Sequence, residues 1–202
     1  MSGRVEFFYD LVSPYSYLAH DRLRDVCGRQ GAELVFRPML LGALQRAVGL
    51  QAPVEVVPKS RYIYRDIQRW AGYYGIPLEF PDPFPFRTLA TVRAALFCEG
   101  RGKLDAFTRE AFDLYWAEGG APKGMAGSDE QGPVSEVARR IGEDPEEVSE
   151  GASEPAVKEA LKSATTEAQE RGAFGAPTFF VGDEMFWGND RLHFVEEALK
   201  RS

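Results

Sequence analysis

The chain opens with two apolar runs typical of strands, separated by a stretch in which apolar residues recur at helical spacing. Val5 to Tyr9 is apolar and aromatic, which is typical of a buried strand, and 33–37 predicts a second strand closed by Pro38. Ser13 can cap the helix between them, Pro14 suits its first position, and Gly28 or Gly31 can end it. Such a β-α-β unit makes the two strands parallel. The apolar positions of the predicted helix are Tyr15, Leu18, Ala19, Leu23, Val26 and Cys27.

From about Leu40 the apolar spacing becomes helical. The pattern predicts helices over 40–48, 63–74, 88–99 and 104–118, then a glycine-rich loop over 119–132. Further helices are predicted from Asp144-Pro145 and over 153–171. The prolines between 81 and 85 indicate an extended segment.

The last thirty residues return to a β pattern. We predict a strand over 178–181, a tight turn at Gly182-Asp183, a return strand over 184–187, and a final helix capped by Asn189 or Asp190. The fold class is therefore α/β, with a large all-helical block inserted into a small mixed sheet. The expected division is 1–39 with 172–202 as the sheet domain and 40–171 as the helical insertion.

Composition and charge narrow the function. A chain of 202 residues with 44% hydrophobic content can bury one sizeable core. A net charge of -7 gives no electrostatic reason to expect nucleic acid or an anionic membrane as a partner. The first residues do not have the pattern of a signal peptide, and no apolar run approaches bilayer length, so we expect a cytoplasmic protein. Cys27 and Cys98 are then expected to be buried, reduced thiols, and the two histidines give no metal site.

The order of elements resembles a thioredoxin fold with the helical insertion of the DsbA-like branch. In that fold a reactive thiol lies at a helix N-terminus, where unsatisfied amides and the helix dipole stabilise an anion. This chain has Ser13-Pro14-Tyr15-Ser16 there, and Ala176-Pro177 where the fold places a cis-proline. A hydroxyl cannot exchange disulfides, so we expect an external thiol, with Ser13 donating a hydrogen bond to its sulfur. From these four residues alone, Ser13 is better explained as a plain helix cap.

The motifs taken together resemble the 2-hydroxychromene-2-carboxylate isomerase family and are similar to kappa-class glutathione transferases. The likeness covers essentially the whole chain. Its motifs are Phe8-Tyr9-Asp10-Leu11-Val12-Ser13-Pro14-Tyr15-Ser16-Tyr17-Leu18-Ala19, Arg37-Pro38-Met39-Leu40-Leu41-Gly42-Ala43, Phe174-Gly175-Ala176-Pro177-Thr178-Phe179-Phe180 and Phe186-Trp187-Gly188-Asn189-Asp190-Arg191-Leu192.

The resemblance implies glutathione as cofactor and assigns residues to it. Ser13 would hold the sulfur, and the backbone of Ala176 beside cis-Pro177 would pair with the cysteinyl part. Asn189 and Asp190 would receive the γ-glutamyl end, and Lys59 would reach the glycyl carboxylate. Taken singly, Asp190 also reads as a helix cap and Lys59 as a solvated surface charge.

Three further positions bear on specificity. After Val48-Gly49 the family pattern has an asparagine that contacts glutathione, but this chain has Leu50, with Gln51 beside it. Arg46 is a candidate anchor for a substrate carboxylate. Trp187 is a candidate substrate wall, to which Tyr62, Trp70 and Tyr74 could contribute, although their helical spacing is also that of core residues.

The implied activity is a glutathione-dependent cis-trans isomerisation. It would interconvert 2-hydroxychromene-2-carboxylate-type compounds and trans-hydroxybenzylidenepyruvates in aromatic catabolism, with a small aromatic α-keto acid or chromene carboxylate as substrate and a homodimer as the assembly. The alternatives are a kappa-class-like glutathione transferase and a non-catalytic, glutathione-binding DsbA-like protein. Disulfide oxidoreduction is disfavoured because no Cys-x-x-Cys is present. A serine nucleophile is disfavoured because His20 lies two turns along the helix from Ser13.

Overall fold

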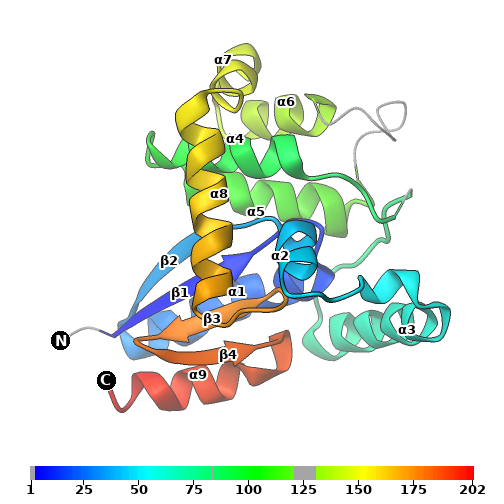
Figure 1. Cartoon of the computed structure of the whole chain (residues 1–202), viewed down its shortest axis with the longest axis vertical. Coiled ribbons are helices and arrows are strands. Elements are labelled where there is room, and N and C mark those ends of the chain that lie inside the picture. Colours follow the sequence, from blue (N-terminus) through cyan, green and yellow to red (C-terminus); the bar gives the residue numbers. More distant parts are fainter. Residues whose placement is uncertain (1–2, 83, 121–130) are drawn as a thin grey trace.

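A computed structural model describes residues 3–82, 84–120 and 131–202, and these form a four-stranded mixed sheet with the order β2-β1-β3-β4 (Figure 1). β1 (Arg4–Tyr9) pairs in parallel with β2 (Glu33–Pro38) and antiparallel with β3 (Thr178–Val181). β3 and β4 (Glu184–Trp187) form the antiparallel hairpin. The predicted β-α-β start, the closing hairpin and the mixed thioredoxin-like sheet are confirmed.

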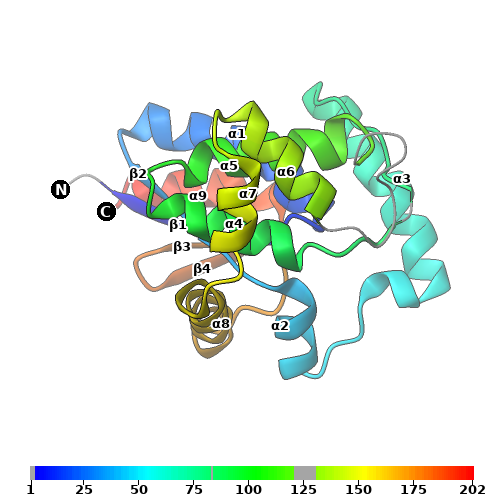
Figure 2. The same cartoon turned by 90° about the horizontal axis from the view of Figure 1, so that it is seen from above.

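Helices cover both faces of this sheet (Figures 1 and 2). α1 (Pro14–Gln30) and α9 (Leu192–Leu199) contact each other on one face, whereas α8 (Pro155–Glu170) crosses the other. α1 ends at Gly31, whose positive φ of 60° is the left-handed conformation that glycine adopts at helix ends. Its N–H donates to the last carbonyls of the helix, so Gly31, not Gly28, is the stop signal.

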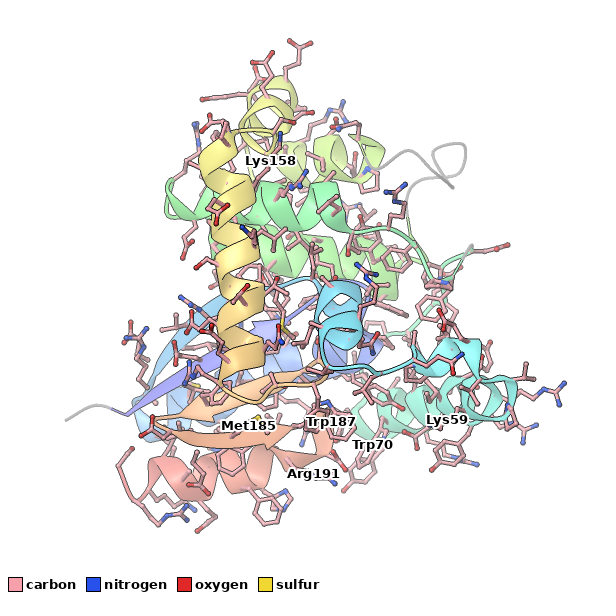
Figure 3. The ribbon with its side chains drawn as sticks, viewed as in Figure 1. Lys59, Trp70, Lys158, Met185, Trp187 and Arg191 are labelled. Atoms are coloured by element: carbon pink, nitrogen blue, oxygen red, sulfur yellow. The ribbon has the colours of Figure 1, made fainter. Side chains whose placement is uncertain are left out.

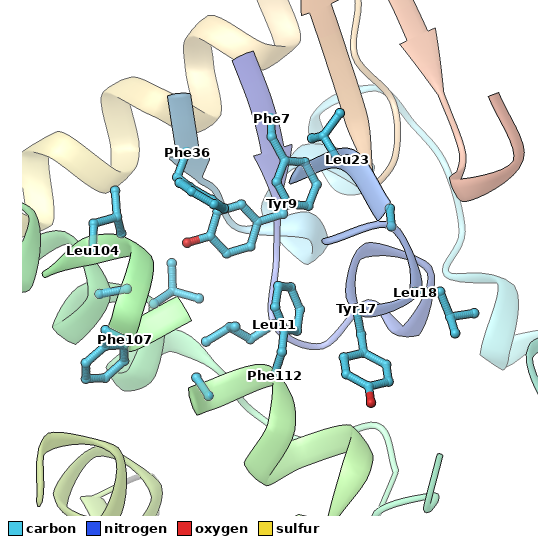
Figure 4. Packing of buried hydrophobic residues seen from close by; sticks show 14 of the residues in the cluster. Phe7, Tyr9, Leu11, Tyr17, Leu18, Leu23, Phe36, Leu104, Phe107 and Phe112 are labelled. Carbon is cyan, nitrogen blue, oxygen red and sulfur yellow. The ribbon is translucent and has the colours of Figure 1, made fainter. Parts of the chain in front are cut away.

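Alternation along the central strands creates a core on each face. Phe7 and Tyr9 of β1 and Phe179 of β3 point to the side of α1, where they join the larger apolar cluster. Phe8 and Phe180 point to the other side, against residues of α2 and α8. Figure 4 shows the larger cluster continuing from Phe7 and Tyr9 to Leu104, Phe107 and Phe112.

The helical block gathers beyond one end of the sheet, with α3 projecting apart from the others (Figure 1). The structure gives it α2 (Leu41–Ala47), α3 (Val57–Tyr74), α4 (Leu89–Glu99), α5 (Leu104–Phe112), α6 (Gln131–Arg140) and α7 (Pro145–Gly151), with a 3-10 turn at Pro53–Glu55 and a π-helical turn at Asp113–Ala117. α6 was missed by the sequence prediction, although Val134, Val137 and Ala138 have helical spacing and are buried. Residues 121–130 of the predicted glycine-rich loop lie outside the described residues.

Polar side chains as well as apolar packing join the block to the sheet. The Tyr9 hydroxyl lies 2.5 Å from Thr108 Oγ1, Tyr17 Oη donates to the Pro77 carbonyl over 2.6 Å, and Trp116 Nε1 donates to the Leu11 carbonyl over 2.8 Å. The larger apolar cluster contains residues of both predicted domains. The division at 39/40 and 171/172 therefore stays a prediction.

Two general expectations can be compared with the described residues. Cys27 and Cys98 are buried free thiols, as predicted, and burial raises the pKa of each to about 11. Within the described part of the chain, no helix is both long and apolar enough to cross a membrane.

Candidate functional site

The hydroxyl of Ser13 links the start of α1 to the loop before β3. Ser13 is buried; its Oγ accepts a hydrogen bond from Ser16 N over 3.2 Å, which is the predicted helix cap. The same oxygen donates its proton to the carbonyl of Ala176 over 3.0 Å, across 163 positions of sequence. Ser13 is therefore both a cap and a bond between the two segments that the sequence singled out.

The loop before β3 presents its backbone beside Ser13. The Ala176–Pro177 peptide bond is cis, as predicted. The Pro177 carbonyl accepts from Gly188 N over 3.0 Å, which ties the loop to the end of β4. The N–H of Ala176 donates to no acceptor among the described residues, so it is available to pair with an extended ligand.

Asp10 is a buried polar residue that the sequence prediction gave no role. Its carboxylate accepts hydrogen bonds from Val12 N over 3.1 Å, Leu41 N over 2.8 Å and Thr88 Oγ1 over 2.7 Å. Burial raises the pKa of Asp10, and the donated hydrogen bonds act in the opposite direction. Because Leu41 begins α2 and Thr88 precedes α4, this carboxylate fixes two helices of the block to the segment that carries Ser13. A lone polar residue between an apolar strand and Ser13 was the available signal.

The turn after β4 differs from the prediction. Asn189 and Asp190 do not cap the last helix: they lie in a 3-10 turn, Asn189–Arg191, and α9 begins after Arg191 without a side-chain cap. The carboxylate of Asp190 pairs with Arg191 and lies over Gly188, where an added Cβ would approach Asp190 Oδ1 to 2.8 Å. Gly188 also has a φ of 100°, so a side chain there is disfavoured both by the contact with Asp190 and by the backbone conformation.

Asn189 is held inward. It is buried, its Nδ2 donates to the Tyr74 hydroxyl over 3.4 Å, and its carbonyl accepts from Arg22 over 3.2 Å. The Arg22 guanidinium also lies 3.7 Å from the centre of the Tyr74 ring. These contacts join the turn to α1 and α3.

An open groove of about 510 Å³ runs between α1, α3 and this turn. Ser13 is not among the residues that line it, so the groove extends from Asp190 and does not enclose the Ser13 hydroxyl. Its lining combines both signs of charge with aromatic rings, and includes Arg22, Asp66, Arg69, Trp70, Tyr74 and Asp190. The hydroxyl of Tyr15, two residues after Ser13, donates to Asp66 Oδ2 over 2.8 Å. This bond anchors α3 to the start of α1.

The predicted cations and Leu50 lie on or directly after the helices α2 and α3. Lys59 is on α3 and Arg46 on α2, and neither side chain has an ion pair or hydrogen bond within the described ranges. Leu50 follows α2 and is 47% exposed. Figure 3 places Lys59 and Trp70 toward opposite ends of α3, with Trp187 at the end of β4.

Trp187 forms a half-exposed wall beside the cis-proline loop. Its ring centre lies 5.0 Å from that of Phe174, and an added Cβ on Gly175 would approach Trp187 Nε1 to 2.5 Å. The indole therefore rests directly on the backbone at Gly175. Tyr62, for which helical spacing favoured a core position, is 61% exposed, whereas Trp70 and Tyr74 are half-buried beside the groove.

The two histidines lie in different surroundings. His20 is buried between the rings of Phe36 and Phe112, and His193 is exposed on α9, where it lines the groove. Both were predicted to be packing or surface residues, which is confirmed. Within residues 3–82, 84–120 and 131–202 there is no cluster of three His, Cys, Asp or Glu side chains that could hold a metal.

The Ser13 hydroxyl and the Ala176 backbone, which the structure brings together, suit a short peptide thiol. A hydroxyl at a helix N-terminus is suited to a thiolate, and the free N–H of Ala176 to a peptide carbonyl. The carboxylate of Asp190 and the ammonium of Lys59 are suited to charged ends of opposite sign. Ser16, the second position of the motif, has a fully buried hydroxyl with no partner among the described residues, so it offers no exposed group.

Comparisons with known proteins identify the family. A family model described as a DSBA-like thioredoxin domain matches residues 4–200. The chain is 36% identical over 201 residues to a 2-hydroxychromene-2-carboxylate isomerase of Sphingobium xenophagum, covering 98% of this chain and 99% of the relative. It is 26% identical over 212 residues to glutathione S-transferase kappa 1 of Caenorhabditis elegans, covering 98% and 91%.

A solved structure of a protein with the same name as the first relative has a similar fold. A 2-hydroxychromene-2-carboxylate isomerase superimposes with a TM-score of 0.85 at 33% identity, covering 98% of this chain and 95% of that one.

Proposed function

Since the chain belongs to the DsbA-like thioredoxin-domain family, in the group of the 2-hydroxychromene-2-carboxylate isomerases, we propose that it is a glutathione-dependent isomerase of small aromatic acids. The observation that carries the proposal is the Ser13 hydroxyl, held between the α1 N-terminus and the Ala176 carbonyl where redox relatives need a cysteine. The substrate class is 2-hydroxychromene-2-carboxylates and trans-hydroxybenzylidenepyruvates.

Ser13 and Ala176 exchange partners in this proposal. The Ser13 hydroxyl has one proton, which it donates to the Ala176 carbonyl. A peptide that brings an N–H to that carbonyl releases the Ser13 proton for the ligand sulfur. Donation to the sulfur, with the positive end of the α1 dipole, lowers the thiol pKa from its usual value of about 8.5. Bound glutathione supplies a thiolate that adds reversibly to an unsaturated carbon.

The remaining residues hold the ends of the ligands. The Asp190 carboxylate receives the γ-glutamyl ammonium, with Asn189 fixing the turn from behind. Lys59 pairs with the glycyl carboxylate. Arg46 binds the substrate carboxylate, where it also stabilises negative charge that develops on the keto acid. Trp187 forms the wall against which an aromatic substrate stacks.

Leu50 makes the glycyl side of the site weaker in hydrogen bonding than the family pattern. An apolar side chain, half exposed, cannot replace an amide donor. We therefore include a modest affinity for glutathione in the proposal, and Leu50→Asn is expected to tighten binding.

Ser13→Ala tests the carrying observation directly. Binding of glutathione by calorimetry, combined with the ultraviolet absorbance of the thiolate against pH, should give a lowered thiol pKa in the wild type. In Ser13→Ala the pKa should return toward about 8.5 and turnover should fall about a hundredfold. Ser16→Ala removes a hydroxyl three residues away and should leave both values near wild type. An unchanged thiol pKa in Ser13→Ala would contradict the role of Ser13.

An isomerisation assay separates the proposed activity from the transferase alternative. With a 2-hydroxychromene-2-carboxylate as substrate, we expect turnover only when glutathione is present, and glutathione should be recovered unchanged. A kappa-like transferase, suggested by the kappa relatives, would instead consume glutathione with a halonitrobenzene. A rate no higher than background with the thiol present excludes the isomerase.

The assembly and compartment complete the proposal. We infer a cytoplasmic homodimer from the family likeness, and light scattering on the purified chain tests the assembly. A monomer at working concentrations would remove the dimer from the proposal without affecting the chemistry.

A further inference from the structure

Five basic side chains between residues 41 and 75 have no partner among the described residues. Arg46, Lys59, Arg61, Arg65 and Arg69 form neither an ion pair nor a side-chain hydrogen bond with any described residue, and all five are exposed. We call these five residues the cationic collar. Most cations elsewhere in the described chain are paired, as in Arg29–Glu196, Arg101–Glu147, Arg140–Glu118 and Arg171–Glu6.

The collar also differs in charge from the rest of the protein. The stretch 41–75 contains five basic and two acidic residues, a net charge of +3, whereas the whole chain has a net charge of -7. One of those two acids, Asp66, accepts the hydrogen bond of Tyr15. A paired cation is largely cancelled by its neighbour, but an unpaired one projects a potential over about a Debye length, roughly 8 to 10 Å.

The fold joins the two helices that carry the collar to the segment around Ser13. α2 is anchored by the bond from Leu41 N to Asp10, three residues before Ser13, and α3 by the bond from Tyr15 to Asp66. Arg69 lines the same groove as Asp190. In Figure 3 Lys59 lies on α3, near this side of the molecule, whereas Lys158 lies at the far end of α8.

We propose that the cationic collar draws anionic carboxylate ligands to the Ser13 site of an otherwise acidic protein. Its potential acts on encounter, before any ligand is bound, and so raises the association rate and kcat/KM. Arg61 and Arg65, which hold no ligand in the proposed site, act in this way alone and do not change kcat. That these ligands are glutathione and a keto acid rests on the proposed function. The local positive potential itself does not rest on it.

Tryptophan quenching measures the potential without any reaction. Trp187 is 45% exposed and Trp70 half-buried, whereas Trp116 is fully buried and silent to a dissolved quencher. Iodide, an anion, and acrylamide, a neutral molecule, both quench the fluorescence of the exposed tryptophans. The ratio of the two quenching constants therefore reports the potential near the site.

The chain offers a matched pair of variants. Arg61→Glu/Arg65→Glu reverses two exposed cations spaced four residues apart on α3, and Lys158→Glu/Lys162→Glu does the same on α8. At low salt we expect the α3 variant to lower the iodide constant about two- to threefold, with acrylamide unchanged. The α8 variant should leave both constants near wild type. No change in the α3 variant, or an equal change in both variants, overturns the proposal.

The salt dependence of turnover tests the consequence for the ligand. The wild-type kcat/KM for the keto acid should fall as ionic strength rises, and this slope should flatten in the α3 variant while kcat stays the same. If quenching responds but no isomerisation is found, the collar stands and the proposed function fails. If isomerisation is found but quenching does not respond, the function stands and the collar fails.

Discussion

The two sides of the candidate site are built in opposite ways. The sheet-side wall, made of Ser13, Ala176 and Pro177, is buried at Ser13 and tied by hydrogen bonds to α1 and β4. The proposed helix-side wall, made of Arg46 on α2 and Lys59 on α3, is exposed and has no bonded partners among the described residues. The group that would handle a sulfur is thus fixed before a ligand arrives, and the groups that would hold its charged ends are solvated. Changes on the helix side should alter affinity more than chemistry.

The largest effect is expected where the two walls are joined. Asp10→Ala removes the acceptor of the buried Thr88 hydroxyl and of two part-buried backbone N–H groups. We expect the free energy of unfolding to fall by roughly 3 to 5 kcal/mol, measured by urea titration. Thr88→Val, which removes one donor only, should cost about 1 kcal/mol. A loss in Asp10→Ala no greater than in Thr88→Val would mean that the carboxylate does not join the walls.

Lys59→Gln sharpens the contrast on the helix side alone. Removing a charged partner of the glycyl carboxylate should weaken glutathione binding about tenfold by calorimetry, which corresponds to about 1.4 kcal/mol. The stability should be unchanged because Lys59 is exposed. Lys158→Gln, a like change on α8, should bind as the wild type does. Equal binding by both variants would remove Lys59 from the site.

His20 lies behind the sheet-side wall and tests whether protonation there matters. Burial lowers the pKa of His20, so between this pKa and about 6.5 the unfolded chain binds more protons than the folded one. Stability is therefore highest above pH 6.5 and is lost as the pH falls. If His20 stays neutral in the folded state, the free energy of unfolding falls by about 0.7 kcal/mol between pH 7 and pH 6.

His20→Phe keeps an aromatic ring between Phe36 and Phe112. The loss of stability between pH 7 and pH 6, measured from urea midpoints at the two pH values, should be absent in this variant. An identical pH profile in wild type and variant would show that His20 is not the titrating group.

Gly175→Ala should have the smallest effect on stability and tests the rim of the sheet-side wall. The new Cβ would approach the Trp187 indole too closely, and the half-exposed ring can swing outward, so we expect a loss below about 0.5 kcal/mol. The displaced indole should shift the tryptophan emission and raise KM for an aromatic substrate. Gly28→Ala, where a Cβ meets nothing within 4 Å, is the control and should leave both unchanged.

The sequence predicted the sheet-side wall better than the helix-side wall. Ser13 and Pro177 lie at element boundaries, where local rules for caps and strand starts apply and a family motif marks the place. Asp10 was missed because its three donors come from distant segments, and spacing along the chain does not encode such contacts. The caps proposed at Asn189 and Asp190 were wrong because a 3-10 turn precedes α9, and a cap residue also suits that turn.

Periodicity was informative about helices and less so about their exposure. α3 was predicted from its apolar stripe, but the same spacing put Tyr62 in the core, and the structure leaves it 61% exposed. A helix that projects from the block has fewer neighbours to cover its aromatic residues (Figure 1). α6 was missed because the sequence prediction extended the glycine-rich loop to Gly132 and began the next helix only at Asp144.

The bond from Ser13 to Ala176 also has a consequence for the time at which the site first exists. Its partners are 163 residues apart, and a ribosome that adds about 5 to 20 residues per second needs roughly 10 to 30 seconds to make the second after the first. The α1 N-terminus is therefore synthesised early, but its thiol-holding geometry waits for the end of the chain. A nascent or truncated chain lacking the last strands should present Ser13 as an ordinary helix cap with no hold on a thiol.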